Sequence, residues 1–257
     1  MLELDQVTLF RQQRQVLGPL SLSLKSGQFC AVLGANGAGK SSLLSLLSGL
    51  DAPASGRLSF AFANGRHTIR QLAQHRALMP QFHALGFDFS VREVVMLGRT
   101  PHHGMCDAKD HRKLTDKALA LSGMLDFSGR RYTRLSGGQQ ARVQFARALA
   151  QLNCGEGGDK LLLLDEPTAS LDLRYQLLIM KCIRQLCDAG LCCVAVLHDI
   201  NLAAQFADLI VLLDQGKAAA VGAPSETLTE PLLSRVFQLP VRVLDNVFPD
   251  RPMIAMP

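Results

Sequence analysis

The sequence predicts an α/β protein with a mostly parallel sheet, and two observations carry this prediction. First, residues 29–50 combine a short apolar segment, a glycine-rich turn and a leucine-rich stretch, as expected of a strand–turn–helix unit. Second, three further apolar segments alternate with helical patterns. Such alternation implies parallel pairing through crossover helices and a sheet that is covered on both faces.

The expected elements follow one another along the chain. The first strand, 29–33, ends at Gly34, and leucines at 43, 44, 46, 47 and 50 then follow at close to helical spacing. Gly49 and Pro53 lie near the end of that helix, where glycine and proline are common. Later strands are expected at 161–164, 192–198 and 209–214, and helices at 173–188 and 201–207.

Residues from about 82 to 140 differ in character, because most of them form helical patterns. The segments "VREVVMLGR" and "DHRKLTDKALALSGML" are separated by the loop "TPHHGMCD". We interpret 82–140 as a helical subdomain inserted into a single domain that spans 1–257, whose α/β core consists of 1–81 and 141–257.

The stretch "AQLNCGEGGDK", residues 150–160, places three glycines and a lysine directly before a strand of four leucines. A phosphate-binding loop follows a strand and opens a helix, whereas this stretch leaves a helix and enters a strand. We therefore expect an exposed connection that binds no nucleotide, with no role for Cys154.

The composition indicates a globular protein in a reducing environment. Hydrophobic residues make up 48% of the 257 residues and charged residues 19%, which disfavours disorder. The seven cysteines are odd in number and form no CxxC pair, so neither a disulfide framework nor a zinc ribbon is expected. Acidic residues at positions 3 and 5 disfavour a secretion signal, and the apolar runs are far shorter than the roughly 20 residues of a membrane-spanning helix.

The strongest motif is "GANGAGKS", residues 34–41, which fits the phosphate-loop pattern GxxxxGK[ST] between a strand and a helix. Backbone N–H groups and the positive end of the following helix would hold phosphate oxygens. Lys40 is expected to reach the β- and γ-phosphates, and the Ser41 hydroxyl to ligate Mg²⁺. The predicted nucleotide-binding residues of this loop are Gly34, Ala35, Asn36, Gly37, Ala38, Gly39, Lys40, Ser41 and Ser42.

The segment "LLLLDEP" supplies the acidic half of a nucleotide site. Four leucines predict a strand buried on both faces, which places Asp165 at its carboxyl end, where α/β sheets bind ligands. Asp165 is then expected to hold Mg²⁺. Glu166, one residue later, is positioned to polarise the water that attacks the γ-phosphate.

The segment "LSGGQQ", residues 135–140, precedes the helical run "ARVQFARALA". Ser136, Gly137 and Gly138 form a small-residue loop at the start of that helix, which favours a second anion-binding position without a lysine.

Together these motifs resemble the ATP-binding cassette (ABC) ATPases of ABC transporters, over essentially the whole chain. The family's order is matched by the phosphate loop, "MPQ" at Gln81, "LSGGQQ", "LLLLDEP", "SLD" ending at Asp172 and "LHD" with His198. The resemblance implies a phosphate-loop ABC ATPase core with an inserted helical subdomain and a small antiparallel β region near the N-terminus. It also implies ATP and Mg²⁺ as cofactors.

The resemblance further implies a role for each motif. Glu166 would be the catalytic base, His198 would hold the γ-phosphate, and Gln81 would contact Mg²⁺ and the attacking water. Two subunits would meet head to tail and sandwich two ATP molecules. The signature residues of one subunit would complete the ATP site of the other; these are Ser136, Gly137, Gly138 and Gln139. Asp172 would communicate across the dimer. The Mg²⁺ ligands would be Ser41, Gln81 and Asp165.

Phe10, in "VTLFRQQRQVL", lies where the family often has an aromatic residue stacked on adenine. Stacking on adenine and simple core packing are both open for this ring. Arg11 is the alternative contact for the base.

The segment "VREVVMLGRTPHHG", residues 91–104, resembles the importer group that handles iron siderophores, haem and cobalamin. In that group this part of the helical subdomain docks the permease. The resemblance implies a homodimer on the cytoplasmic face of the inner membrane, attached to two permease copies and served by a periplasmic substrate-binding protein. Haem is the favoured cargo, ahead of ferric siderophores and then cobalamin, because of "HDINLAAQFADLIVLLDQGK", the proline-containing end and the long 150–160 connection.

Two other hypotheses are weaker. The net charge of +5 allows a regulatory or nucleic-acid-linked ATPase, but the basic residues are scattered rather than clustered, so no nucleic-acid partner is expected. A metal site at His102, His103, Cys106 and His111 is disfavoured because the spacing fits no common zinc pattern. Exposed histidines in a partner-facing loop are the preferred explanation.

Overall fold

The computed structural model describes residues 1–62, 68–81, 88–152, 159–248 and 251–255. Two expectations fall partly outside these ranges. They are the first residues of the helical subdomain, 82–87, and the glycine-rich part of the 150–160 connection with Cys154.

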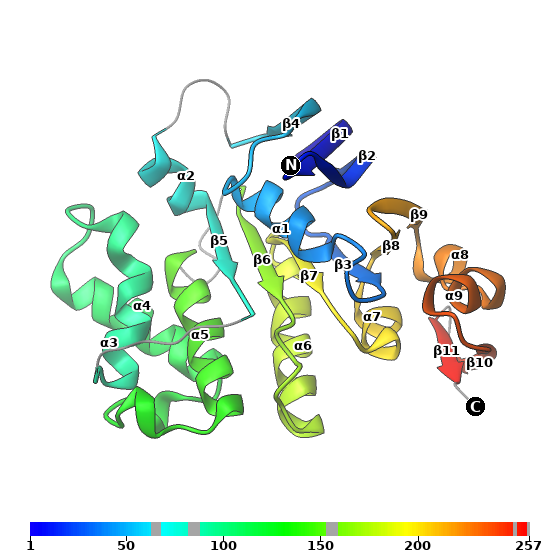
Figure 1. The fold of residues 1–257 in the computed structure, drawn as a ribbon. Coiled ribbons are helices and arrows are strands. Elements are labelled where there is room, and N and C mark those ends of the chain that lie inside the picture. Colours follow the sequence, from blue (N-terminus) through cyan, green and yellow to red (C-terminus); the bar gives the residue numbers. More distant parts are fainter. Residues whose placement is uncertain (63–67, 82–87, 153–158, 249–250, 256–257) are drawn as a thin grey trace.

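A six-stranded sheet forms the centre of the molecule (Figure 1). Its strand order is β5-β6-β7-β3-β8-β9, and every neighbouring pair is parallel except β8 and β9. The mostly parallel sheet is therefore confirmed. The bounds are β3 Phe29–Gly34, β5 Arg76–Met79, β6 Leu161–Asp165, β7 Cys192–Val196, β8 Leu209–Asp214 and β9 Lys217–Gly222.

The elements expected in this core are present, and two more join them. The helices α1 (Lys40–Ser48), α6 (Leu173–Asp188) and α7 (Ile200–Phe206) lie where the sequence predicts helices. The edge strands β5 and β9 were not expected, because β5 has only four residues and β9 is rich in alanine, a residue that is depleted in strands.

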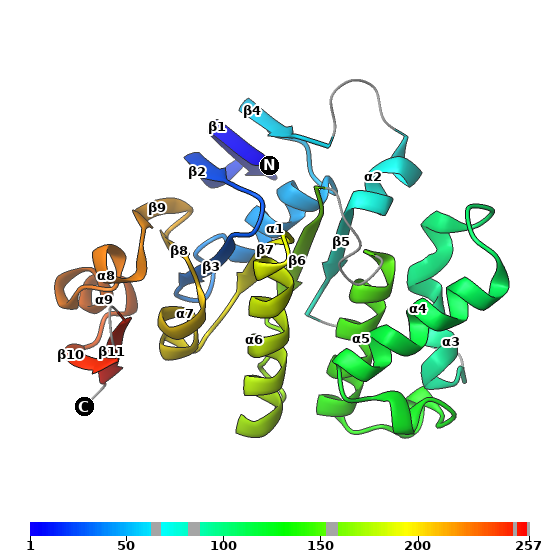
Figure 2. The same cartoon turned by 180° about the vertical axis from the view of Figure 1, so that it is seen from behind.

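A second, three-stranded antiparallel sheet confirms the expected β region near the N-terminus. Its order is β2-β1-β4, with β1 Leu2–Arg11, β2 Arg14–Leu24 and β4 Ser55–Phe60. Seen from both sides, it lies above the amino-terminal half of α1 and the central sheet (Figures 1 and 2).

The helical region lies beyond the β5 edge of the central sheet (Figures 1 and 2). Its elements are α2 Ile69–His75, α3 Val91–Met96, a 3-10 helix at Leu97–His102, α4 Ala108–Leu121 and α5 Gly137–Gln151, with short 3-10 turns at Leu125–Phe127 and Tyr132–Arg134. The helix α5 packs against both α3 and α4, and it runs through the expected boundary at 140/141. The division into core and subdomain, with its second boundary at 140/141, remains a prediction.

The end of the chain forms a small lobe at the opposite side of the sheet (Figure 1). It consists of α8 Pro224–Thr227, α9 Glu230–Phe237 and an antiparallel hairpin of β10 Arg242–Phe248 and β11 Arg251–Ala255.

Two hydrophobic clusters cover the two faces of the central sheet. On β6, Leu162 and Leu164 belong to the cluster that contains α5 and α6, whereas Leu161 and Leu163 belong to the cluster that contains α1 and the antiparallel sheet. All four leucines have no exposed surface. Successive side chains of a strand point to opposite faces, so an uninterrupted apolar run is what a strand covered on both faces requires.

Buried thiols are a second property of this core. The six cysteines in the described ranges are free, and five of them are buried, with Cys106 as the exception. Burial raises the pKa of Cys187 and of Cys192 to about 12. In the same ranges, no helix combines the length and the apolarity needed to cross a membrane.

A close approach of backbones fixes the 3-10 helix Leu97–His102 to α5. A Cβ atom added at Gly98 would collide with the carbonyl oxygen of Arg147 and crowd the amide of Gln151. Both collision partners are backbone atoms of a buried helix, so they cannot move aside easily.

We expect Gly98→Ala to lower the free energy of unfolding by about 1–3 kcal/mol, the usual cost of overpacking. Gly129 is the matched control, because a Cβ atom there meets nothing within 4 Å. Gly129→Ala should change the free energy of unfolding by less than about 0.5 kcal/mol. Denaturant titration of the nucleotide-free protein measures both values, and equal stabilities of the two variants would contradict this account.

Candidate nucleotide-binding and hydrolysis site

The loop between β3 and α1 has the backbone shape that phosphate binding requires. Gly39 has a φ of 100° and lies at the amino-terminal cap of α1, where a Cβ atom would come within 2.7 Å of the carbonyl oxygen of Val16. Only glycine fits this position. The helix therefore starts at Lys40 with its first N–H groups free to bind an anion.

Lys40 folds back onto the loop. Its Nζ donates to the carbonyl oxygens of Gly34 and Ala35 at 2.8 and 2.9 Å. Burial lowers the pKa of Lys40, while the carboxylates of Glu166 and Asp165 act in the opposite direction. A phosphate group at this position would offer the ammonium a charged acceptor in place of two carbonyl oxygens.

Asp165 is placed as an Mg²⁺ ligand requires. Burial and the neighbouring Glu166 raise the pKa of Asp165, and a hydrogen bond from the Ser41 hydroxyl opposes this shift. The Oδ1 atom of Asp165 is buried and has no hydrogen-bond partner within the described residues. A buried carboxylate oxygen without a donor, beside a serine hydroxyl, fits the few oxygen ligands that Mg²⁺ takes from a protein in nucleotide sites.

Glu166 is held between two side chains from neighbouring strands. Gln81 Nε2 donates to Glu166 Oε2 at 2.7 Å, and His198 Nε2 lies 2.5 Å from Glu166 Oε1. Gln81 follows β5, Glu166 follows β6, and His198 follows β7. Because these three strands are adjacent and parallel, the side chains after their carboxyl ends meet at one edge of the sheet. We expected all three residues at one site from the sequence motifs, and the structure brings them together.

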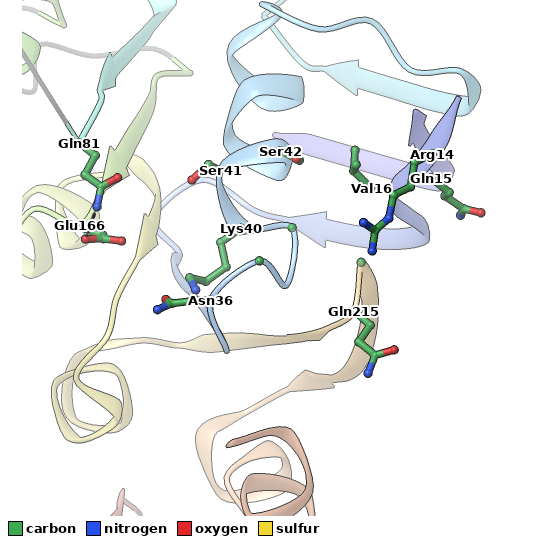
Figure 3. A pocket seen from close by; sticks show the side chains of 13 residues that line it. Arg14, Gln15, Val16, Asn36, Lys40, Ser41, Ser42, Gln81, Glu166 and Gln215 are labelled. Atoms are coloured by element: carbon green, nitrogen blue, oxygen red, sulfur yellow. Dashed lines mark hydrogen bonds between the residues drawn. The ribbon is translucent and has the colours of Figure 1, made fainter. Parts of the chain in front are cut away.

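A cavity of about 690 Å³ joins the loop to this cluster. Figure 3 shows Gln81 and Glu166 at one end, Lys40 and Ser41 in the middle, and Arg14, Val16 and Gln215 at the other end. The lining residues are Arg14, Gln15, Val16, Asn36, Gly37, Gly39, Lys40, Ser41, Ser42, Gln81, Glu166, Gln215 and Gly216.

The two residues expected near the base do not line this cavity, and their contact with the base remains a prediction. Phe10 is 48% exposed and is not among the residues that line the cavity, and Arg11 forms an ion pair with Asp51 at 2.6 Å. Arg14, Gln15 and Val16 of β2 line the cavity instead, and Gln15 is the residue that pairs with Phe10 across the hairpin. No motif marks the start of β2, so the sequence alone does not indicate that Arg14 and Val16 line the cavity.

The expected signature residues lie at the start of α5. The Ser136 hydroxyl accepts from the N–H of Gln139, and the Gln139 side chain accepts from the N–H of Ser136, which makes a capping box. Gly138 packs so closely on the segment before α6 that a Cβ atom would lie 2.8 Å from the carbonyl oxygen of Ser170. Asp172 caps α6 by accepting from the N–H of Tyr175.

None of these signature residues lines the 690 Å³ cavity. Gly137 instead lines a second cavity of about 430 Å³, which also touches Gln81 and Glu166. Completion of the site of a partner subunit by Ser136 and Gly138 remains a prediction.

One of the histidines expected to be exposed in a partner-facing loop, His102, is buried instead. His102 is only 5% exposed, and its Nε2 donates to the carbonyl oxygen of Gln151. Burial lowers the pKa of His102, and Arg99 and Lys160 lower it further. Among the described residues, no group of three or more His, Cys, Asp or Glu side chains is arranged to hold a metal ion. His102 is thus a buried structural residue, whereas His103 is exposed as expected.

Three side chains together cap the carboxyl end of α5. Arg99 donates to the backbone carbonyl oxygen of Ala150 at 2.7 Å. His102 donates to that of Gln151 at 2.8 Å, and Lys160 to that of Leu152 at 2.9 Å. The last carbonyl groups of a helix have no partner within the helix, and the positive charges of Arg99 and Lys160 interact favourably with the negative end of the helix dipole. The described ends of the 150–160 connection therefore anchor the helix that carries the signature.

A sequence comparison identifies the family. A family described as ABC transporter matches residues 17–169. The chain belongs to the ABC transporter family. The match includes the phosphate loop, Gln81, the signature and Glu166, whereas His198 lies beyond it.

Relatives with curated names extend over most of the chain. Hemin import ATP-binding protein HmuV of Rhizobium meliloti is 42% identical over 236 residues, which cover 90% of this chain and 88% of the relative. The protein of the same name from Pseudomonas entomophila is 40% identical over 258 residues, with 99% of each chain covered.

Solved structures of ABC proteins share the fold. A structure described as a metal-chelate type ABC transporter in an inward-facing conformation has a TM-score of 0.82 at 28% identity, with 99% of this chain and 95% of that chain covered. A dimeric bacterial ABC transporter cassette has a TM-score of 0.74 at 27% identity, with 87% and 98% covered.

We expect Asp165→Asn to stabilise the nucleotide-free protein at pH 7, because the pKa of Asp165 is raised in the folded state. An acid with a raised folded-state pKa favours folding only below its unfolded-state pKa, and this contribution is lost as the pH rises through the folded-state value. The stability gain of the variant should therefore shrink as the pH falls from the raised folded-state pKa toward the ordinary aspartate value near 4, below which it no longer changes. Urea titrations at pH 7 and pH 4 test this, and a gain that grows at low pH would contradict it.

Proposed function

We propose that this chain is the ATP-hydrolysing subunit of a bacterial ABC importer, and that the importer carries haem. The central support is the position of Glu166, which lies between Gln81 and His198 at one end of the phosphate-loop cavity. The relatives named as hemin import proteins, which cover most of this chain at about 40% identity, support haem as the cargo.

The site residues divide the hydrolysis reaction among them. Lys40 and the N–H groups of the loop bind the β- and γ-phosphates. Mg²⁺, held by Ser41 and Asp165 and contacted by Gln81, would supply positive charge to the phosphate oxygens. Glu166 accepts a proton from the attacking water, and the two hydrogen bonds already made to its carboxylate hold its orientation.

The proposed assembly follows the dimeric cassette that this chain resembles. Two copies would bind two ATP molecules, with Ser136, Gly138 and Asp172 of each copy facing the site of the other. A permease would dock on the groove of about 450 Å³ that is lined by Phe89, Glu93, Met96, Leu97, Arg99, Thr100, His103, Ala108 and His111. This places the subunit at the cytoplasmic face of the inner membrane, with a periplasmic binding protein delivering the cargo.

We expect Glu166→Gln to lower the ATP turnover number at least about 100-fold while Mg–ATP binding persists, because the amide cannot accept the proton from water. Lys40→Ala should instead weaken nucleotide binding. Glu3→Gln, an exposed change on β1, is the control that should leave turnover unchanged. Turnover of Glu166→Gln at the wild-type rate, measured with the permease present, would refute this assignment.

The cargo can be tested with the reconstituted complex. We expect binding protein loaded with haem to stimulate ATP hydrolysis several-fold, and binding protein loaded with a ferric siderophore or cobalamin to have no effect. Stimulation by the siderophore or by cobalamin alone would replace haem as the cargo but retain the ATPase role. Salt-sensitive DNA binding without any copurifying membrane protein would favour a nucleic-acid-linked ATPase.

A further inference from the structure

The cavity of about 430 Å³ lies between two parts of the chain, and we call it the seam cavity. One wall is formed by residues at and after the ends of β5 and β6, among them Met79, Gln81 and Glu166. The other wall is formed by α5 and the 3-10 turn before it, with Tyr132 and Gln144. Gln81 and Glu166 also line the 690 Å³ cavity, so an occupant of the seam cavity would touch two residues of the hydrolysis site.

Gln144 brings an unpaired polar atom to this cavity. Its side chain is buried, with 4% of the residue exposed, and it lines the seam cavity. Its Nε2 donates to the hydroxyl of Tyr132 at 2.8 Å. Its Oε1 is buried as well and has no hydrogen-bond partner in the part of the chain that the structure describes. Burying a polar atom without a partner is costly, so a ligand that supplies one is favoured here.

A hydroxyl is the ligand group that suits Gln144. If the amide turned over, Oε1 would accept from Tyr132 and Nε2 would be unpaired instead. A hydroxyl donates to an oxygen and accepts from a nitrogen, so it pairs with either orientation. A neutral ligand is favoured, because Glu166 would repel an anion. An amine would have to compete with Gln81 and His198 for the oxygens of Glu166.

The remaining walls of the seam cavity suit an aromatic ring. Met79 and Tyr132 are buried and line it together with Pro80, Ala141 and Ala169. A methionine sulfur and a tyrosine ring both pack favourably against an aromatic group. The volume also lies within the range of small-molecule sites, which are mostly apolar with a few polar groups.

We propose that the seam cavity binds a small neutral molecule composed of an aromatic ring with one hydroxyl group, and that its occupant lowers ATP turnover. The hydroxyl pairs with Gln144, and the ring packs against Met79 and Tyr132. The occupant lies against Gln81 and keeps it on Glu166, so Gln81 is not free to contact Mg²⁺ and the attacking water. Binding is a property of the chain itself, whereas the effect on turnover rests on the proposed ATPase function.

The binding test is a ligand-observed NMR titration of the full, nucleotide-free chain with para-ethylphenol and para-ethyltoluene. The two molecules differ by a hydroxyl in place of a methyl group, and an apolar cavity alone prefers the methyl compound. We expect the phenol to bind about tenfold more tightly, because only the phenol pairs with Gln144. This comparison needs no substitution. Equal or tighter binding of para-ethyltoluene, or no saturable binding of the phenol, would overturn the proposal.

Two substitutions locate the bound ligand. Gln144→Leu should weaken para-ethylphenol binding about tenfold without weakening para-ethyltoluene binding, because it removes the hydrogen bond and retains the volume. Ala141→Phe should abolish binding of both molecules, because the added ring fills the cavity. The matched control is Gln185→Leu, the same substitution at an exposed residue of α6 outside the cavity, and it should change neither affinity. Full affinity for the phenol in Gln144→Leu would place the ligand elsewhere and contradict the proposal.

The effect on hydrolysis is a separate measurement. Para-ethylphenol should lower the maximal rate of ATP turnover and leave the KM for ATP unchanged, and Gln144→Leu should need about tenfold more of it for the same loss. A rise in KM alone would place the phenol in the nucleotide cavity, and binding without loss of turnover would refute the inhibitory role. If the chain hydrolysed no ATP, the proposed function would fail, while the binding titration would still decide whether the site exists.

Discussion

The parallel register of β5, β6, β7 and β3 is the constraint on which the site depends. Each strand ends at the same edge of the sheet, and the residue that follows it supplies one part of the chemistry: Gln81, Glu166, His198 and the phosphate loop. The buried leucines of β6 keep this register, because a shift by one residue would exchange the two faces of the strand. The catalytic geometry is thus set by packing far below the cavity.

The helix α5 links the core to the helical region. Its first turn is capped by Ser136, and its last turn receives donors from the 3-10 helix that lines the surface groove and from the residue before β6. The helix is thus capped locally at its start and by distant segments at its end, so polar groups at both ends have partners. Arg99, His102 and Lys160 are buried, and their hydrogen bonds to the helix carbonyl groups offset part of the cost of burying polar groups.

Features that depend on neighbouring residues in the chain could be predicted from the sequence. The phosphate loop, the acidic pair at 165–166 and the long apolar strands were predicted because each pattern lies within a few neighbouring positions. The burial of His102 was not predictable, since its partner lies 49 residues away at a helix end. Arg14 was missed because no motif marks the start of β2, and only the folded hairpin shows which of its residues reach the cavity.

The buried thiols of the core give the folded state a chemical signature. A thiol reacts as its thiolate, and burial suppresses that form at Cys187 and Cys192 while it hides both sulfurs from reagents in solution. Alkylation of Cys187 therefore requires α6 to separate from the sheet, whereas alkylation of Cys192 requires the opposite face of the sheet to open. Cys106, which is partly exposed, reacts without any such opening. The alkylation rates of Cys187 and Cys192 therefore report opening of the fold, and the rate at Cys106 is the internal reference.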